Sequence, residues 1–126
     1  MIYGIGADLL RIERGEKLWQ RHGQRAVLKL LHPAERPAFG LAANPGHHLA
    51  RAFAVKEAFV KALGTGFHGV GYHDVGVLRE LKQRPQLIFS ATMRQRLDTL
   101  GISGAHLSLS DEAGMVLAFV VLETAG

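Results

Sequence analysis

Residues 53–66 read FAVKEAFVKALGTG and lie within the strongest helical pattern of the chain. Apolar side chains recur at helical spacing from about residue 47 to residue 63, which predicts one long helix with a buried stripe. The members of the stripe are Ala52, Val55, Phe59, Ala62 and Leu63. Gly64 follows them directly, and glycine at that position commonly ends a helix. We expect this helix to be the central element of the fold.

Shorter patterns on either side of the helix predict the remaining elements. Residues 2–8 favour a buried strand, and residues 106–110 and 115–122 predict a hairpin turned at residues 111–114. Further strands are expected at 75–81 and 86–89, turns at 44–46 and 82–85, and shorter helices at 9–23, 26–31, 33–41 and from Ser90 to about 101. The predicted fold class is α+β: residues 1–126 form a single small domain, with one long central helix packed on a mainly antiparallel sheet.

The composition narrows the possible functions. The chain has 126 residues, of which 48% are hydrophobic and 21% charged, as in soluble globular proteins. It has no cysteine, which excludes disulfides, thiolate nucleophiles and cysteine-ligated metals. Because no apolar run approaches the ~20 residues of a membrane span and no secretory leader pattern is present, we expect a cytoplasmic protein. The net charge of +4 favours a nucleic acid, a phosphorylated small molecule or an acidic protein as partner.

Two acids and a lysine form the first candidate site. Asp8 ends the first predicted strand, where an acid often only caps the helix that follows. Glu57 and Lys61 are four residues apart and share one face of the long helix, where a solvated pair contributes only ~0.2–0.5 kcal/mol. However, one or two carboxylates are also what Mg²⁺ takes from a protein when phosphate oxygens and waters complete its shell. In that interpretation Lys61 neutralises the phosphate.

A glycine-rich tripeptide and a polar strand face are weaker candidates. Gly64-Thr65-Gly66 follows the long helix, and its glycines either end the helix or let the backbone approach a phosphate. His106, Ser108 and Ser110 lie on one face of a predicted strand, with leucines on the other. Such alternation requires no function, and spacing alone defines no Ser–His–Asp triad.

Taken together, three motifs resemble those of the holo-acyl-carrier-protein synthases, the small phosphopantetheinyl transferases. Residues 4–14 read GIGADLLRIER, similar to the family's G-I-G-x-D followed by I-x-R. Residues 53–66 match F-A-x-K-E-A-x-x-K-A-x-G-T-G at every fixed position, and residues 106–110 read HLSLS, which is similar to the family's H-x-S-L-S strand. The resemblance covers essentially the whole chain and implies a 4′-phosphopantetheinyl transferase-like fold.

The resemblance also implies an activity and its site residues. The activity is Mg²⁺-dependent transfer of 4′-phosphopantetheine from coenzyme A to a serine of apo-acyl carrier protein, which serves fatty acid biosynthesis. Asp8 and Glu57 match the metal-ligating acids and Lys61 the lysine beside the reacting phosphate, so these three are the expected catalytic residues. The cofactor-binding positions match Lys61, Gly64, Thr65, Gly66, His106 and Ser108. The general base stays open between a metal-bound water and Glu57 acting through a water.

The expected partners are the carrier protein and further copies of the chain. Arg14 matches an arginine that docks the acidic carrier protein. Arg21 lies seven residues on and so stacks on the same helical face, and Arg25 adds another turn if the helix continues past Gly23. The resemblance further implies a homotrimer with active sites in clefts between subunits.

Two alternatives accompany this interpretation, and the chain departs from the family pattern at several positions, of which position 111 is one. A basic nucleic-acid-binding module without catalysis explains the net charge, but it leaves the acids at positions 8 and 57 without a purpose. An inactive paralogue that only binds carrier protein is the second alternative. Position 111, where many members of the family carry a histidine, is Asp111 here.

Overall fold

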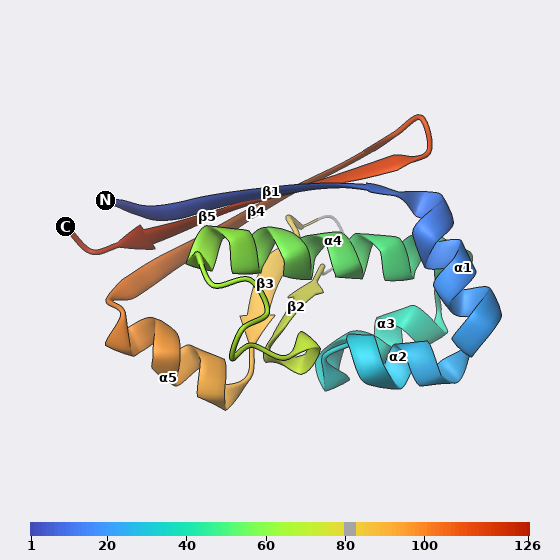
Figure 1. The fold of residues 1–126 in the computed structure, drawn as a ribbon, viewed down its shortest axis with the longest axis horizontal. Coiled ribbons are helices and arrows are strands. Elements are labelled where there is room, and N and C mark those ends of the chain that lie inside the picture. Colours follow the sequence, from blue (N-terminus) through green and yellow to red (C-terminus); the bar gives the residue numbers. More distant parts are fainter. Residues whose placement is uncertain (80–82) are drawn as a thin grey trace.

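Helix α4, Pro45–Leu63, runs through the middle of the molecule between two sheets (Figure 1). The computed structural model describes residues 1–79 and 83–126. On one side of α4 lies a three-stranded antiparallel sheet in the order β1-β5-β4, formed by β1 Ile2–Arg11, β4 Ile102–Glu112 and β5 Met115–Thr124. A two-stranded antiparallel sheet, β2 Val75–Leu78 and β3 Gln86–Phe89, lies on the other. The predicted α+β class is confirmed.

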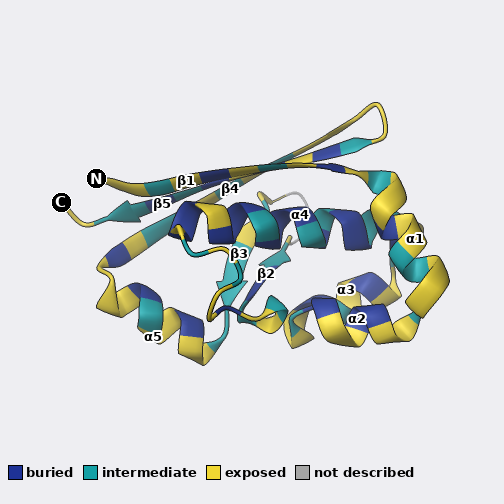
Figure 2. Cartoon of the chain, in the orientation of Figure 1, coloured by how far each residue is buried: buried dark blue, intermediate teal, exposed yellow. Residues whose placement is uncertain are grey.

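Shorter helices surround the two ends of α4 (Figure 1). They are α1 Ile12–His22, α2 Gln24–Leu30, the 3-10 turn η1 Pro33–Glu35, α3 Arg36–Gly40, the 3-10 turn η2 Tyr72–Asp74 and α5 Ala91–Thr99. Helices α1, α2 and α3 lie near the start of α4, and α5 lies near its end. Helix α4 is buried over most of its surface, whereas α1 is mostly exposed (Figure 2). All five residues of the predicted stripe are buried, so α4 is the core of the fold.

Strand β1 touches the backbone of α4 because two glycines face the helix. A Cβ atom added to Gly4 would lie 1.9 Å from the carbonyl oxygen of Ala62, and one added to Gly6 would lie 1.9 Å from that of Ala58. Any side chain at these positions would overlap the helix, so the contact requires glycine. Asp8 is the next residue on the same face of the strand. The glycines therefore determine how closely Asp8 approaches α4.

The two faces of the larger sheet differ in what covers them. In the antiparallel register, Asp8 lies opposite Ala118 and Ala118 lies opposite Leu109, so these residues share the inner face toward α4. On this face Val116, Ala118, Val120 and Leu122 of β5 are fully buried. The outer face carries Ile5, Leu9, Leu117 and Phe119, which are exposed. The sheet thus has one face in the core and one apolar face on the surface.

The first predicted boundary, between strand and helix at residue 8, is wrong. Strand β1 continues to Arg11, because Leu9, Leu10 and Arg11 pair with Leu117, Val116 and Met115 of β5. Asp8 consequently lies within the strand and does not cap a helix. The local pattern of leucines and arginines suits a helix, but pairing with a strand more than 100 residues away decides the conformation.

Two other boundaries also differ. The helix does not continue past Gly23, whose φ of +53° separates α1 from α2. Asn44-Pro45-Gly46 is the first turn of α4 and not a free turn, since the Asn44 side chain accepts a hydrogen bond from the His47 N–H at 3.2 Å. Proline is well tolerated at the first helical position, where its missing N–H has no intrahelical partner.

The remaining predicted elements are confirmed with small changes. Met93 N–H donates to Ser90 Oγ at 3.1 Å, which is the predicted cap of α5. The predicted hairpin exists, with longer strands, and the predicted helix over 33–41 divides into η1 and α3. Strand 75–81 is confirmed as far as Leu78; its last two residues, like Lys82 of the turn, lie outside the described residues. Across residues 1–79 and 83–126, no helix combines the length and apolar character that crossing a bilayer requires.

We expect Gly6→Ala to destabilise the protein, because the added methyl group would overlap the Ala58 carbonyl and push β1 away from α4. Overpacking of this kind costs typically about 1–3 kcal/mol. Urea unfolding would measure the loss. Gly104→Ala is the matched strand control, since its Cβ meets its nearest neighbour at an ordinary 3.5 Å. Equal stability of the two variants would contradict the proposed role of the close contact.

Candidate active site

The structure brings Asp8, Glu57 and Lys61 together at the contact between β1 and α4. Lys61 Nζ lies 3.1 Å from Asp8 Oδ1 and donates a second hydrogen bond to the carbonyl oxygen of Ala7 at 3.0 Å. The Asp8 side chain is only 14% exposed, whereas that of Lys61 is 50% exposed. The ammonium group is therefore held in place by β1 and still faces solvent.

Asp8 is close enough to Glu57 to affect the pKa of the Glu57 carboxyl. Partial burial raises the pKa of the Glu57 carboxyl, and the negative charge of Asp8 raises it further. The positive charges of Lys61 and Arg14 act in the opposite direction and do not cancel the rise. A cation near both acids would stabilise the charged form of Glu57.

One oxygen of Asp8 is left without a partner. Oδ2 of Asp8 is buried and accepts no hydrogen bond from any residue that the structure describes. Buried polar atoms are nearly always paired, so an unpaired carboxylate oxygen at this place requires an explanation. Among the described residues, no group of three or more His, Asp or Glu side chains is arranged to hold a metal. The donor set fits a hard cation such as Mg²⁺ that completes its shell with substrate oxygens and waters.

The glycine-rich loop begins one turn beyond Lys61. Gly64 has a φ of +87° and caps α4, as predicted. The N–H groups of Thr65 and Gly66 both point back to the carbonyl oxygen of Val60 at 3.3 Å. The Thr65 hydroxyl donates to the Gly66 carbonyl at 2.8 Å. The loop is thus tied to the end of the helix that carries Lys61.

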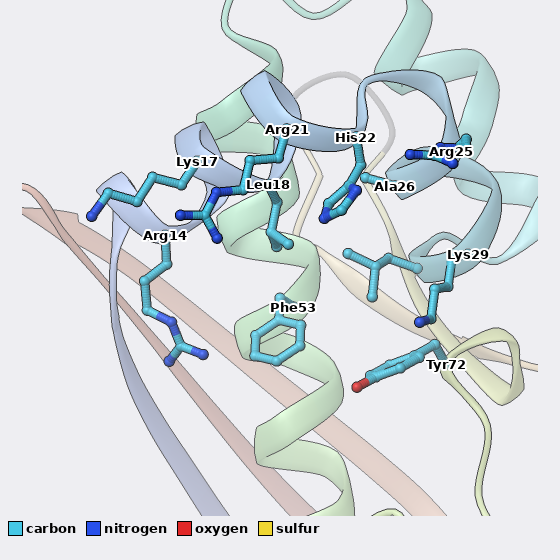
Figure 3. A pocket seen from close by; sticks show the side chains of 11 residues that line it. Arg14, Lys17, Leu18, Arg21, His22, Arg25, Ala26, Lys29, Phe53 and Tyr72 are labelled. Atoms are coloured by element: carbon cyan, nitrogen blue, oxygen red, sulfur yellow. The ribbon is translucent and has the colours of Figure 1, made fainter.

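A basic groove of about 630 Å³ is lined by residues of α1, α2 and α4 and by Tyr72 (Figure 3). Its basic side chains are Arg14, Lys17, Arg21 and His22 from α1, and Arg25 and Lys29 from α2. Phe53 and Tyr72 form an aromatic part of the wall, with ring centroids 6.1 Å apart, and the Arg14 guanidinium lies 5.6 Å from the Phe53 centroid. Although the helix breaks at Gly23, α2 turns so that Arg25 lines the same groove as Arg14 and Arg21.

A second groove, of about 780 Å³, lies between α4, β2 and β4. Three arginines line it: Arg51, Arg79 and Arg84. Asp111 lines it as well, 2.6 Å from His47 Nε2 and 3.9 Å from Arg51 Nη1. The sequence analysis missed this cluster, because its members come from segments far apart in the chain and no local motif joins them.

The structure does not bring His106 and Ser108 to Asp8 within one chain. His106 lies opposite Val121 and Ser108 opposite Phe119, so both lie on the outer face of the sheet, whereas Asp8 lies on the inner face. His106 forms an ion pair with Glu123, and Ser108 borders the second groove. Within a single chain these two residues therefore belong to a different surface from Asp8.

Comparisons with known proteins agree on one family. Residues 4–119 match the 4′-phosphopantetheinyl transferase superfamily. A holo-[acyl-carrier-protein] synthase of Alkalilimnicola ehrlichii is 47% identical over 126 residues, which cover 98% of each chain. The crystal structure of the Neisseria meningitidis synthase has a TM-score of 0.92 at 40% identity, covering 98% of this chain and 100% of that one. The Helicobacter pylori synthase in complex with coenzyme A has a TM-score of 0.81 at 28% identity, covering 94% and 99%.

We expect Asp8→Asn to lower the pKa of Glu57 in metal-free protein, because it removes the like charge that opposes ionisation. Lys61→Met should raise the same pKa, because it removes a charge that stabilises the carboxylate. Nuclear magnetic resonance titration of the Glu57 carboxyl carbon in the presence of EDTA would measure both shifts. Asp98→Asn on α5 is the control and should leave the value unchanged. An unaltered pKa in Asp8→Asn would show that the two acids are not neighbours in solution.

Proposed function

Because the chain belongs to the 4′-phosphopantetheinyl transferase superfamily, we propose that Asp8, Glu57 and Lys61 form its active site. The reaction is that of a holo-[acyl-carrier-protein] synthase: 4′-phosphopantetheine moves from coenzyme A to a serine of apo-acyl carrier protein, in fatty acid biosynthesis, and adenosine 3′,5′-bisphosphate leaves. The alternative of a nucleic-acid-binding module is not supported. The proposal retains the cytoplasmic location expected from the sequence.

The observation that carries the assignment is the incomplete coordination of Asp8. Its Oδ1 binds Lys61, and its buried Oδ2 accepts no hydrogen bond from the described residues, beside a second carboxylate that repels it. Asp8 and Glu57 would hold Mg²⁺ here. When bound, the ion stabilises negative charge on the pyrophosphate of coenzyme A.

Besides holding the ion, Asp8 orients Lys61, and Lys61 and Glu57 act on the phosphate and on the serine proton. Lys61 is already oriented by Ala7 and Asp8, so its charge faces the phosphate without reorganisation as the transition state forms. The serine oxygen forms a bond to the β-phosphorus while the bond from that phosphorus to the departing adenosine bisphosphate breaks. The serine proton passes through a water to the carboxylate of Glu57.

Transfer should require the two acids and a divalent cation. We expect EDTA to abolish it and Mg²⁺ to restore it, and Asp8→Ala and Glu57→Ala each to lower the rate by about 100-fold or more. Mass spectrometry of apo-acyl carrier protein would follow the gain of one phosphopantetheine. Asp98→Ala, which removes an exposed acid from α5, should keep full activity. Full activity in Asp8→Ala or Glu57→Ala would disprove the metal assignment.

The basic groove is the proposed docking site for the carrier protein. It places the positive charges of Arg14, Arg21 and Arg25 around aromatic side chains (Figure 3). Carrier proteins are acidic, and opposite charge speeds encounter and fixes orientation. Arg14 is also close enough to lower the pKa of Glu57, so it joins the docking surface to the reacting groups.

Charge reversal in the groove should weaken binding of the carrier protein selectively. We expect Arg21→Glu to raise its Michaelis constant about 3- to 10-fold, since an exposed ion pair contributes roughly 0.2–1 kcal/mol and reversal adds repulsion. The dependence on salt should flatten, and the constant for coenzyme A should stay the same. Arg94→Glu, which reverses an exposed arginine on α5, is the matched control. A change in the coenzyme A constant alone would place Arg21 in a nucleotide pocket.

A homotrimer would complete the site. Ile5, Leu9, Leu117 and Phe119 form an apolar outer sheet face with exposures of 53, 63, 40 and 40%, and an apolar face of this kind favours protein contact. His106 and Ser108 lie on the same face, away from Asp8. Packing three copies in a ring buries this face and brings His106 and Ser108 of one copy into the cleft of the next.

Light scattering should give about three times the chain mass of 13.7 kDa. We expect Phe119→Lys to yield monomers with little transfer activity, because a charge would replace an apolar contact. Leu100→Lys is the matched control, since Leu100 is 39% exposed but lies beside α5, away from the sheet face. A fully active monomer would rule out the shared cleft.

A further inference from the structure

Glu35 and Lys56 form a buried ion pair that has no task in the reaction described above. Their exposures are 1% and 0%, and they are the buried charged residues among those the structure describes. Lys56 Nζ donates to Glu35 Oε1 at 2.9 Å. Burying two charges is costly unless both are fully bonded. The surroundings of the pair therefore indicate what it does.

Both partners are bonded to the backbone of other elements. Glu35 Oε1 also accepts from the N–H of His32 at 2.8 Å, and Oε2 accepts from the N–H of Val77 at 3.1 Å. Lys56 donates a second hydrogen bond to the Val75 carbonyl. The network thus joins α4 to η1 and to β2 through one carboxylate and one ammonium group.

The backbone of β2 leaves room for the carboxylate. A Cβ atom on Gly76 would lie 2.8 Å from Cδ of Glu35, so only glycine at this position admits the pair. Val75 and Val77, on either side, supply the carbonyl and the N–H that bind it. The sequence of β2 is therefore adapted to the ion pair as well as to its own strand partner.

Helix α4 is held against β1 by the close approach of Gly4 and Gly6 and by the hydrogen bonds of Lys61, and the ion pair adds an anchor on the side that faces β2. The helix is buried along most of its length, and its small side chains include Ala50, Ala54, Ala58 and Ala62. Apolar burial is non-directional, so a helix with apolar residues on most sides gains little from one rotation over a neighbouring one. The directional hydrogen bonds of Lys56, by contrast, can form at only one rotation of the helix. Because successive residues on a helix point about 100° apart, the direction of Lys56 determines that of Glu57.

We propose that Glu35 and Lys56 are positioning residues, which hold α4 at the rotation that directs Glu57 and Lys61 toward Asp8. This inference rests on the proposed function of those three residues. Lys56 and Glu57 are neighbours in the KEA triplet, residues 56–58, but have different roles. Lys56 anchors α4 to η1 and β2, whereas Glu57 belongs to the active site on the side of β1. Displacement of a reacting group by about 1 Å is sufficient to lower a rate about 100-fold.

The test separates position from stability with three variants. Lys56→Met removes the anchor and leaves Glu35 buried without its counter-ion. Glu35→Gln/Lys56→Met removes both charges, so it should recover much of the lost melting temperature without restoring the link from α4 to β2. Met93→Ala is the stability control, because Met93 is 2% exposed on α5 and belongs to the same core, away from the site. The readouts are melting temperature, kcat, and the affinity for Mn²⁺ measured by electron paramagnetic resonance.

We expect kcat and Mn²⁺ affinity to fall about 10- to 100-fold in Lys56→Met and to stay low in the double variant. Met93→Ala should lose melting temperature but keep both values when measured well below its transition. The inference is overturned if the double variant has wild-type kcat and Mn²⁺ affinity, or if Met93→Ala loses as much of both as Lys56→Met. If Lys56→Met does not fold, kcat and Mn²⁺ affinity of the double variant alone decide the test. Absence of Mn²⁺ binding and of transfer in the wild-type chain would instead overturn the proposed function, and this inference with it.

Discussion

The direct contact between strand β1 and the backbone of helix α4 is the constraint on which the site depends. Gly4 and Gly6 bring the strand against the carbonyl groups of Ala62 and Ala58. Lys61 and Glu57 each precede one of these alanines, and Asp8 follows the glycines on the same strand face. The contact that closes the core therefore also brings two carboxylates and an ammonium group together. Core packing and chemistry share the same few residues, so neither can change without the other.

Two groups of polar side chains on α4 differ as a structural network differs from an active site. Around Glu35 and Lys56, both carboxylate oxygens are bonded and the ammonium group has two acceptors, as expected of a buried network that holds structure. Around Asp8, one buried oxygen accepts no hydrogen bond from the described residues, and the pKa of Glu57 is raised. A carboxyl whose pKa is higher in the folded than in the unfolded state lowers stability as the pH rises between the two values. Without a cation the site therefore lowers the stability of the fold, and a bound cation offsets that cost.

The proximity of Glu57 and Lys61 in the candidate site could be predicted because they occupy a motif with strong local rules. A Glu and a Lys four residues apart share a helix face wherever a helix forms, and Gly64 ends that helix without help from the rest of the chain. The presence of Asp8 beside them could not be derived from spacing, since it lies 49 positions before Glu57 in the chain. It followed from the resemblance of the three motifs to one family, to which residues 4–119 belong.

The sequence by itself determined the central helix, its buried stripe, the Glu57–Lys61 face and the closing hairpin, because helical and strand periodicity act over a few residues. Only the tertiary structure decided that Leu9–Arg11 is strand, that α2 returns Arg25 to the groove of Arg14, and that His106 and Ser108 face away from Asp8. It also joined Glu35 to Lys56 and Asp111 to His47. These outcomes depend on contacts between residues 11 to 108 positions apart, and local pattern carries no information about which distant segment supplies the partner.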